Sequence, residues 1–216
     1  MEEKLFSFLP DQFPNPEAFF VELTGVTYPD PHYRIDRDRS PVLCLEYVIS
    51  GQGSVNIGGQ SFYPKAGDVY LLPMGLHHRY RSDPHNPWQK IWMNVRGTLC
   101  ADLLCAYHLG ETYHIPSCPL LGLFQEFVSV CSSPPSDPWE LDRRCSLLFH
   151  ELLSRIRATL SGLPKTSAGP AEQARDLLDR KLYVPVSVDD TAAAVGLSSS
   201  QLTRLFSARF GVTPYQ

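Results

Sequence analysis

Apolar residues recur at every second position in the first half of the chain, as they do in half-buried strands. Residues 43–49 and residues 88–95 both alternate in this way. Gly58-Gly59 separates two further short strands and is typical of a two-residue hairpin loop. Several short strands between residues 40 and 97 therefore predict a β-barrel or a sandwich. In the last strand, Trp88, Lys90, Trp92 and Asn94 share one predicted face, and Ile91, Met93 and Val95 share the other.

Residues 98–160 change to the three- and four-residue spacing of helices. The last of these helices begins with Asp137 as its cap and Pro138 in its first turn, and Glu140 can reach back to complete a capping box. Most of this segment should pack on the strands. Its apolar stripe is longer than one face of a barrel should cover, so we expect a homodimer through the helices between Leu120 and Leu160. The stripe consists of Leu141, Cys145, Leu148, Leu152, Ile156 and Leu160.

Residues 188–214 predict a helix, a tight turn and a second helix. Ala192 leaves room for a crossing helix, Gly196 suits the left-handed conformation of the turn, and Ser198 can cap the helix that follows. This layout is typical of a helix-turn-helix, whose second helix enters the DNA major groove. A plain helical hairpin is the alternative. The second helix buries Leu202, Leu205 and Phe206 in this interpretation and ends near Gly211 and Pro214.

The pattern divides the chain into two domains and a linker. Residues 1–160 form the strand-rich domain with its helices, and residues 161–170 are small, polar and helix-breaking, as linkers are. Residues 171–216 form a helical domain that begins with a helix over residues 171–183. The first 39 residues are rich in Pro and aromatics, and they form either an arm over the barrel mouth or its first strands.

Composition narrows the class of protein. The net charge of −4 gives no global attraction to nucleic acid, so DNA binding would depend on a local basic face. No apolar run approaches a membrane span, and the N-terminus lacks the apolar core of a signal peptide. The six cysteines contain no Cys-x-x-Cys pair, which favours buried free thiols over disulfides or a zinc site. We expect a cytoplasmic protein without a metal or cofactor.

The segment Leu-Ser-Ser-Ser-Gln-Leu-Thr-Arg-Leu-Phe-Ser-Ala-Arg-Phe-Gly-Val-Thr-Pro-Tyr, residues 197–215, resembles the first helix-turn-helix of AraC/XylS-type transcription regulators. The resemblance implies promoter DNA as a partner and places Ser200, Thr203 and Arg204 on the groove-facing side. Arg204 is suited to a base contact, and a phosphate contact or a surface salt bridge is the alternative. The family joins two such units by a long helix. We therefore expect a C-terminally truncated regulator or a fragment that binds DNA weakly.

The strand-rich half resembles a cupin and, in more detail, the sensory half of AraC-type regulators. Gly67-x5-Pro73-x-Gly75-x2-His78 follows the second cupin motif, whereas the metal-binding first motif has no match near residues 51–59. The expected fold is α+β: a cupin-like β-barrel (jelly roll) with C-terminal helices, then a partial all-α helix-turn-helix domain. His77 and His78 should point to opposite faces, so they cannot easily chelate a metal together.

The family resemblance implies a small-molecule effector, a sugar or another small polar metabolite, inside the barrel. Trp92 matches the aromatic ring against which sugar-sensing members hold their ligand, and its flat face suits a pyranose. Lys90 stands where a sugar-binding member has a histidine, which admits a charged ligand. The predicted cavity is lined by Trp92, Lys90, His78, Tyr80 and an arginine, either Arg37 or Arg39. These aromatic residues could instead be core filler, which is the preferred interpretation for Trp88.

Two functions compete at this point. The first is a ligand-responsive, DNA-binding transcription regulator. The second is a non-regulatory cupin enzyme, such as a sugar isomerase, with a helical tail. The missing metal motif and the predicted helix-turn-helix favour the regulator. The sequence does not identify the effector or the operator.

Overall fold

The computed structural model describes residues 2–161, residue 174 and residues 187–214. Contacts divide the chain into two compact units, Met1–Ser161 and Gly162–Gln216, which we describe separately. The predicted linker and the helix predicted over residues 171–183 lie outside the described residues, apart from Ser161 and Ala174. No helix in the described ranges is long and apolar enough to cross a membrane.

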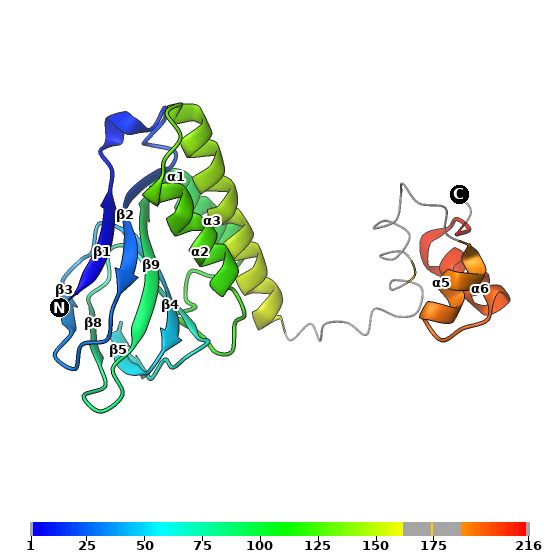
Figure 1. Ribbon diagram of the computed structural model, residues 1–216, viewed down its shortest axis with the longest axis horizontal. Coiled ribbons are helices and arrows are strands. Elements are labelled where there is room, and N and C mark those ends of the chain that lie inside the picture. Colours follow the sequence, from blue (N-terminus) through cyan, green and yellow to red (C-terminus); the bar gives the residue numbers. More distant parts are fainter. Residues whose placement is uncertain (1, 162–173, 175–186, 215–216) are drawn as a thin grey trace. The chain divides into compact units, whose positions relative to one another are not determined.

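Two sheets face each other in the first unit (Figure 1). The large sheet has the strand order β1-β2-β9-β4-β7-β10 and the small sheet the order β3-β8-β5-β6. The strands of the two sheets are β1 (Glu3–Ser7), β2 (Phe20–Thr27), β3 (Arg34–Arg37), β4 (Leu43–Ser50), β5 (Gly53–Ile57), β6 (Gln60–Phe62), β7 (Val69–Leu72), β8 (His78–Ser82), β9 (Gln89–Arg96) and β10 (His114–Ile115). The structure corrects the prediction of a closed β-barrel, because backbone hydrogen bonds join strands only within each of the two sheets. The first 39 residues supply β1, β2 and β3, together with the short 3-10 helix η1 (Pro10–Gln12), so they are strands and not a separate arm.

The hairpin between β5 and β6 follows the prediction. Val55 pairs with Phe62, and Ile57 pairs with Gln60 across the Gly58-Gly59 loop. Both glycines have positive φ, +55° and +82°, as the favoured two-residue turn requires. The loop therefore sets the register that turns Val55 and Phe62 toward the interior between the sheets.

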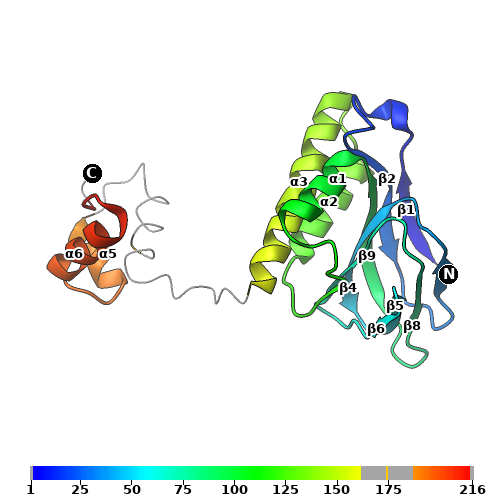
Figure 2. The same ribbon diagram turned by 180° about the vertical axis from the view of Figure 1, so that it is seen from behind.

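Three helices cover the outer side of the large sheet (Figures 1 and 2). They are α1 (Thr98–Ala106), α2 (Leu121–Ser132) and α3 (Pro138–Leu160). Asp137 caps α3 by accepting a hydrogen bond from the backbone N–H of Trp139. Glu140 does not complete a capping box as predicted. It accepts two hydrogen bonds from the Arg143 guanidinium instead, because the i,i+3 partner lies on the same side of the helix.

The two predicted faces of β9 lie in two separate cores. Ile91, Met93 and Val95 of β9 pack with α2 and α3 in the larger core. Trp88, on the opposite face, belongs to the smaller core between the sheets. Most of the apolar stripe of α3 is buried inside this unit, since Leu141, Cys145, Leu152 and Ile156 are all buried. This corrects the reason given for a dimer, because the large sheet and α2 cover most of that stripe.

All six cysteines are free thiols, and Cys105 is the exposed one. Cys131 and Cys145 bring their sulfur atoms to 3.9 Å across the α2–α3 contact without a disulfide. The hydrogen bond with the Cys145 thiol and burial raise the pKa of Cys131, which keeps it in the unreactive thiol form.

The second unit contains α5 (Val188–Ala194) and α6 (Ser199–Phe210), joined by a turn at Gly196 with φ +72°. Ser198 caps α6 and forms a capping box with Gln201. Leu202 and Phe206 are buried as predicted, whereas Leu205 is 39% exposed. Leu205 stands one position before Phe206, and this 100° step turns it away from the contact with α5.

Candidate functional site

A buried cation lies between the two sheets, on the inner face of β9. The Lys90 side chain has no exposed surface, and its ammonium forms an ion pair with the Glu46 carboxylate of β4. It also donates to the hydroxyls of Tyr70 and Tyr33, at 3.1 and 3.5 Å. Aromatic rings surround it at 4.6 Å (Tyr33), 4.6 Å (Tyr80), 4.8 Å (Trp88) and 5.8 Å (Tyr70). Lys90 therefore fills an aromatic cage from within.

The two partners stabilise each other's charged form. Burial by itself raises the pKa of Glu46. The Lys90 charge and the hydrogen bonds that the Glu46 carboxylate accepts outweigh burial, so the pKa of Glu46 lies below its usual value. Burial lowers the pKa of Lys90, and the facing carboxylate more than offsets this, so the pKa of Lys90 lies above its usual value. Tyr70 donates to Glu46 at 2.6 Å. Both charges therefore persist at neutral pH without access to water.

Trp92 shares this inner face, two residues farther along β9. Its side chain is 7% exposed, and its indole N–H donates to the hydroxyl of Thr27 at 2.9 Å. Thr24 donates to the Trp92 carbonyl from the same strand β2. Trp92 is thus held at a fixed orientation between the sheets.

Among the described residues, the buried side-chain polar atoms without a partner include those of His78 and Asn94, besides single atoms of Ser82, Trp88 and Asp142. His78 has no exposed surface and Asn94 is 3% exposed. Both ring nitrogens of His78 and the side-chain oxygen of Asn94 lack a hydrogen-bond partner. Burial lowers the pKa of His78, so its ring is neutral at pH 7. Such atoms cost about 1–3 kcal/mol each when they are left unpaired, so a polar partner at either position would stabilise the protein.

The structure decides between the two candidate arginines. Arg37 pairs with His78 across the β3–β8 ladder and is half-buried, so both side chains point to the same face of the small sheet. Arg39 follows β3, is exposed and has a positive φ of 48°. Arg37 is therefore the arginine that the fold brings to the inner face.

The fold brings five of the six predicted residues to the space between the sheets: Trp92, Lys90, His78, Tyr80 and Arg37. The arrangement differs from the predicted single cavity, because side chains fill the space around Lys90. Sequence reasoning missed Glu46, Tyr70, Tyr33 and Asn94. Glu46 is an acidic residue within a strand of apolar neighbours, and that pattern is the one signal that could have marked a buried ion pair.

His77 and His78 point to opposite faces, as predicted. His77 is on the outer side and contacts Asp36 at 2.8 Å. Among the described residues, no group of three His, Cys, Asp or Glu side chains is placed to hold a metal ion.

The residues predicted to face DNA lie on α6. Ser200 and Arg204 are exposed and one turn apart, so they share a face of the helix. Thr203 is half-buried, and its hydroxyl donates to the Ser199 carbonyl at 2.8 Å. That hydroxyl can therefore only accept a hydrogen bond from a partner.

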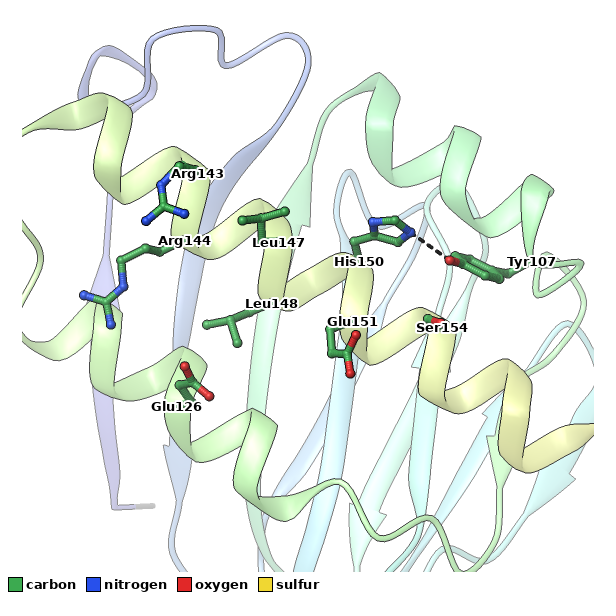
Figure 3. A pocket seen from close by; sticks show the side chains of 9 residues that line it. All are labelled: Tyr107, Glu126, Arg143, Arg144, Leu147, Leu148, His150, Glu151 and Ser154. Atoms are coloured by element: carbon green, nitrogen blue, oxygen red, sulfur yellow. Dashed lines mark hydrogen bonds between the residues drawn. The ribbon is translucent and has the colours of Figure 1, made fainter. Parts of the chain in front are cut away.

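A groove of about 580 Å³ crosses the helical layer, lined by side chains of α2 and α3 and by Tyr107, which follows α1 (Figure 3). Leu147 and Leu148 lie near its middle, and His150 bonds Tyr107 at 2.7 Å. Leu147 is 53% exposed, although it is a large apolar side chain.

The AraC-like ligand-binding domain family matches this chain over residues 20–178, most of its length. The chain belongs to this family. The match covers the inner face with Trp92 and Lys90 and the helices that pack behind it.

Curated relatives of this AraC-like chain are named as operon regulators. The lactose operon transcription activator of Staphylococcus xylosus is 22% identical over 79% of this chain and 63% of its own length. The Msm operon regulatory protein of Streptococcus mutans is 22% identical over 75% of this chain and 60% of its own length. The chain therefore spans about three fifths of these relatives. The solved structure of the AraC-like transcriptional activator CuxR is similar, with a TM-score of 0.41 and 14% identity, over 99% of this chain and 83% of that one.

Proposed function

We propose that this chain senses a small polar effector and belongs to a ligand-responsive, DNA-binding transcription regulator. The family match and the operon regulators among its relatives support this proposal. The effector binds between the two sheets, and residues of α6 contact promoter DNA.

One observation carries the effector site: the unpaired ring nitrogens of His78 and the unpaired oxygen of Asn94, both buried. A ligand with hydroxyl groups can donate to one atom and accept from another, which removes the cost of leaving them unpaired. Trp92 offers its ring face to the apolar side of such a ligand. Arg37 and Tyr80 complete the set that we assign to the effector.

The charge pattern favours a neutral effector, a sugar or a similar polyol. Lys90 is already neutralised by Glu46 and surrounded by rings, so an anionic ligand would have to displace a buried carboxylate. We therefore assign Lys90 a role at the edge of the site, where it holds Tyr80 and the cage in place. Arg39 is exposed and takes no part.

A thermal-shift screen tests this assignment. The protein is screened against neutral sugars and the matching sugar acids. Only the neutral sugars should raise its melting temperature, because a ligand that binds the folded state stabilises that state. His78→Gln should abolish the shift, whereas His77→Gln, the exposed neighbour, should leave it unchanged. Equal shifts in both variants would contradict the proposed site.

The DNA contact is assigned to Ser200, Thr203 and Arg204 on α6. Arg204 has the exposed guanidinium fork that can bind guanine O6 and N7 together, and the two short side chains add little. Fluorescence anisotropy with the native promoter should show a loss of binding in Arg204→Ala and none in Arg155→Ala. Unchanged binding in the first variant would refute its role.

A homodimer through α2 and α3 completes the proposal. The groove in Figure 3 leaves Leu147 exposed at its centre, which suits a self-complementary contact. Sedimentation should show a dimer that Leu147→Glu splits, while Leu9→Glu, at another exposed leucine, leaves it intact. A monomer at high micromolar concentration would exclude this interface. The competing cupin enzyme is tested by metal analysis and turnover assays of the same protein.

A further inference from the structure

The outer face of the small sheet carries three arginines on neighbouring strands. The register places Arg34 of β3 beside Arg81 of β8, which in turn lies beside Ser54 of β5. The next outward-facing row runs through Asp36, Arg79, Asn56 and Ser61. We call Arg34, Arg79 and Arg81, with the polar side chains between them, the basic face. All three arginines are exposed.

The charges of this face are not balanced within the sheet. Arg34 and Arg81 are direct cross-strand neighbours, and like charges in that position destabilise a sheet. Asp36 is the acidic residue of these two rows, and it already contacts both Arg79 and His77 at 2.8 Å. Among the described ion pairs, none includes Arg34 or Arg81. The arrangement does not help the fold, so a partner is the more economical explanation.

Hydroxyls and an amide lie between the arginines: Ser54 accepts a hydrogen bond from Arg81 Nε at 3.3 Å, and Asn56 donates to Ser61 at 2.8 Å. A depression of about 330 Å³ is lined by Ser54, Asn56, Ser61, Tyr63, Arg79 and Arg81. A second, of about 390 Å³, is lined by residues that include His32, Arg34 and Arg81. Arg81 borders both depressions, so its guanidinium stands at the middle of the face. Tyr63 is 73% exposed and adds a hydroxyl at the rim.

We propose that the basic face is a second DNA-contacting surface, which binds the phosphate backbone without reading bases. The proposal rests on the proposed function in that it assumes a partner duplex. Arginine forks, hydroxyls and amides are the groups that hold phosphates, and rows of them across neighbouring strands can meet successive phosphates of a duplex. The chain as a whole has a net charge of −4, so attraction to DNA has to come from a local surface such as this one.

The salt dependence of DNA binding tests this surface directly. Anisotropy of a labelled duplex of scrambled sequence is measured from 50 to 200 mM salt for the full chain and two variants. The face variant carries Arg34→Gln, Arg79→Gln and Arg81→Gln. The control variant carries Lys4→Gln, Lys65→Gln and Arg155→Gln, three exposed cations on other surfaces. A melting temperature at or above that of the wild type establishes that each variant folds, and the face variant should melt somewhat higher because it loses the Arg34–Arg81 repulsion.

Each phosphate contact contributes about 0.9 to the slope of log affinity against log salt. Three lost contacts should flatten the slope by about 2.7, so between 50 and 200 mM the wild type should lose roughly fortyfold more affinity than the face variant. The control variant should keep the wild-type slope. Asp36→Asn should raise affinity at low salt, because it removes the negative charge of the face.

Failure of the two proposals can be told apart. If the face variant keeps the wild-type slope, the basic face does not bind DNA, whatever α6 does. If promoter and scrambled duplexes bind equally and Arg204→Ala has no effect, the proposed promoter contact through α6 fails. The salt dependence of the face variant still tests the basic face in that case. Displacement of the duplex by a few millimolar inorganic phosphate at constant ionic strength would identify a small-oxyanion site and overturn DNA as the occupant. Tighter binding of polyglutamate than of DNA would do the same in favour of an acidic protein.

Discussion

The buried ion pair between Lys90 and Glu46 gives a sharp prediction for stability. Lys90→Met keeps the length of the side chain and removes its charge, and Glu46→Gln keeps the shape of the carboxylate and removes its charge. Each single variant leaves one buried group without its charged partner. The double variant Lys90→Met/Glu46→Gln leaves neither. The three variants form a double-mutant cycle in which the coupling between the charges can be measured.

The structure sets the size of each effect. Lys90→Met leaves a carboxylate that is 2% exposed, with hydrogen bonds from Tyr70 and Cys44 as its remaining support, and should cost about 3–5 kcal/mol. Glu46→Gln leaves an ammonium that still faces four rings, each within 6 Å, and should cost less, about 2–3 kcal/mol. The double variant should be less destabilised than the sum of the singles by about 2–3 kcal/mol.

Urea unfolding followed by tryptophan fluorescence is the assay. All three tryptophans, Trp88, Trp92 and Trp139, lie in the first unit, so the signal reports that unit alone. In the wild type the lowered pKa of Glu46 means that stability is lost as the pH falls through it. Without the Lys90 charge, burial should raise that pKa above its usual value, so Lys90→Met should instead lose stability as the pH rises.

Additive costs in the double variant would refute this reasoning. They would mean that the two charges do not stabilise each other and that the cage, not the ion pair, holds Lys90. An unchanged pH dependence in Lys90→Met would contradict the assignment of Glu46 as a buried carboxylate.

Three further predictions concern single positions. Burial lowers the pKa of His78 from its usual 6.5, so the free energy of unfolding should fall as the pH drops below about 6.5, by up to about 1.4 kcal/mol per pH unit. His78→Gln should remove this part of the pH dependence in urea titrations at pH 7.5 and 5.5. The same pH dependence in the wild type and the variant would contradict the role of His78. A Cβ on Gly53 would lie 2.1 Å from the buried Trp88 ring, so Gly53→Ala should cost about 1–3 kcal/mol, whereas Gly110→Ala, with no atom in reach, should leave the melting temperature unchanged. Ser198→Ala removes the cap of α6 and should cost about 1 kcal/mol, measured as faster amide exchange in that helix; unchanged protection would show that the cap is dispensable.

Local pattern was sufficient for the strands between residues 43 and 95 and for most of the helical faces, but it left residues 1–39 open and missed β10, which lies in a segment predicted to be helical. A period of two residues places Lys90 and Trp92 on one side of β9 and Ile91 on the other, whatever the strand packs against. Gly196 and Ser198 likewise mark the turn and the cap of α6, because left-handed φ and N-capping are properties of single residues.

Tertiary structure alone decided which partners these faces meet. Glu46 faces Lys90 because β4 and β9 are neighbours in a register that brings Glu46 opposite Trp92, and pairings between distant strands leave no local trace in sequence. The same applies to Arg37, which the β3–β8 ladder turns inward. The alternation of β9 determined that a lysine would point inward. Only the packing of the two sheets determined that its charge would meet a carboxylate and four rings, which neutralise and enclose it within the fold.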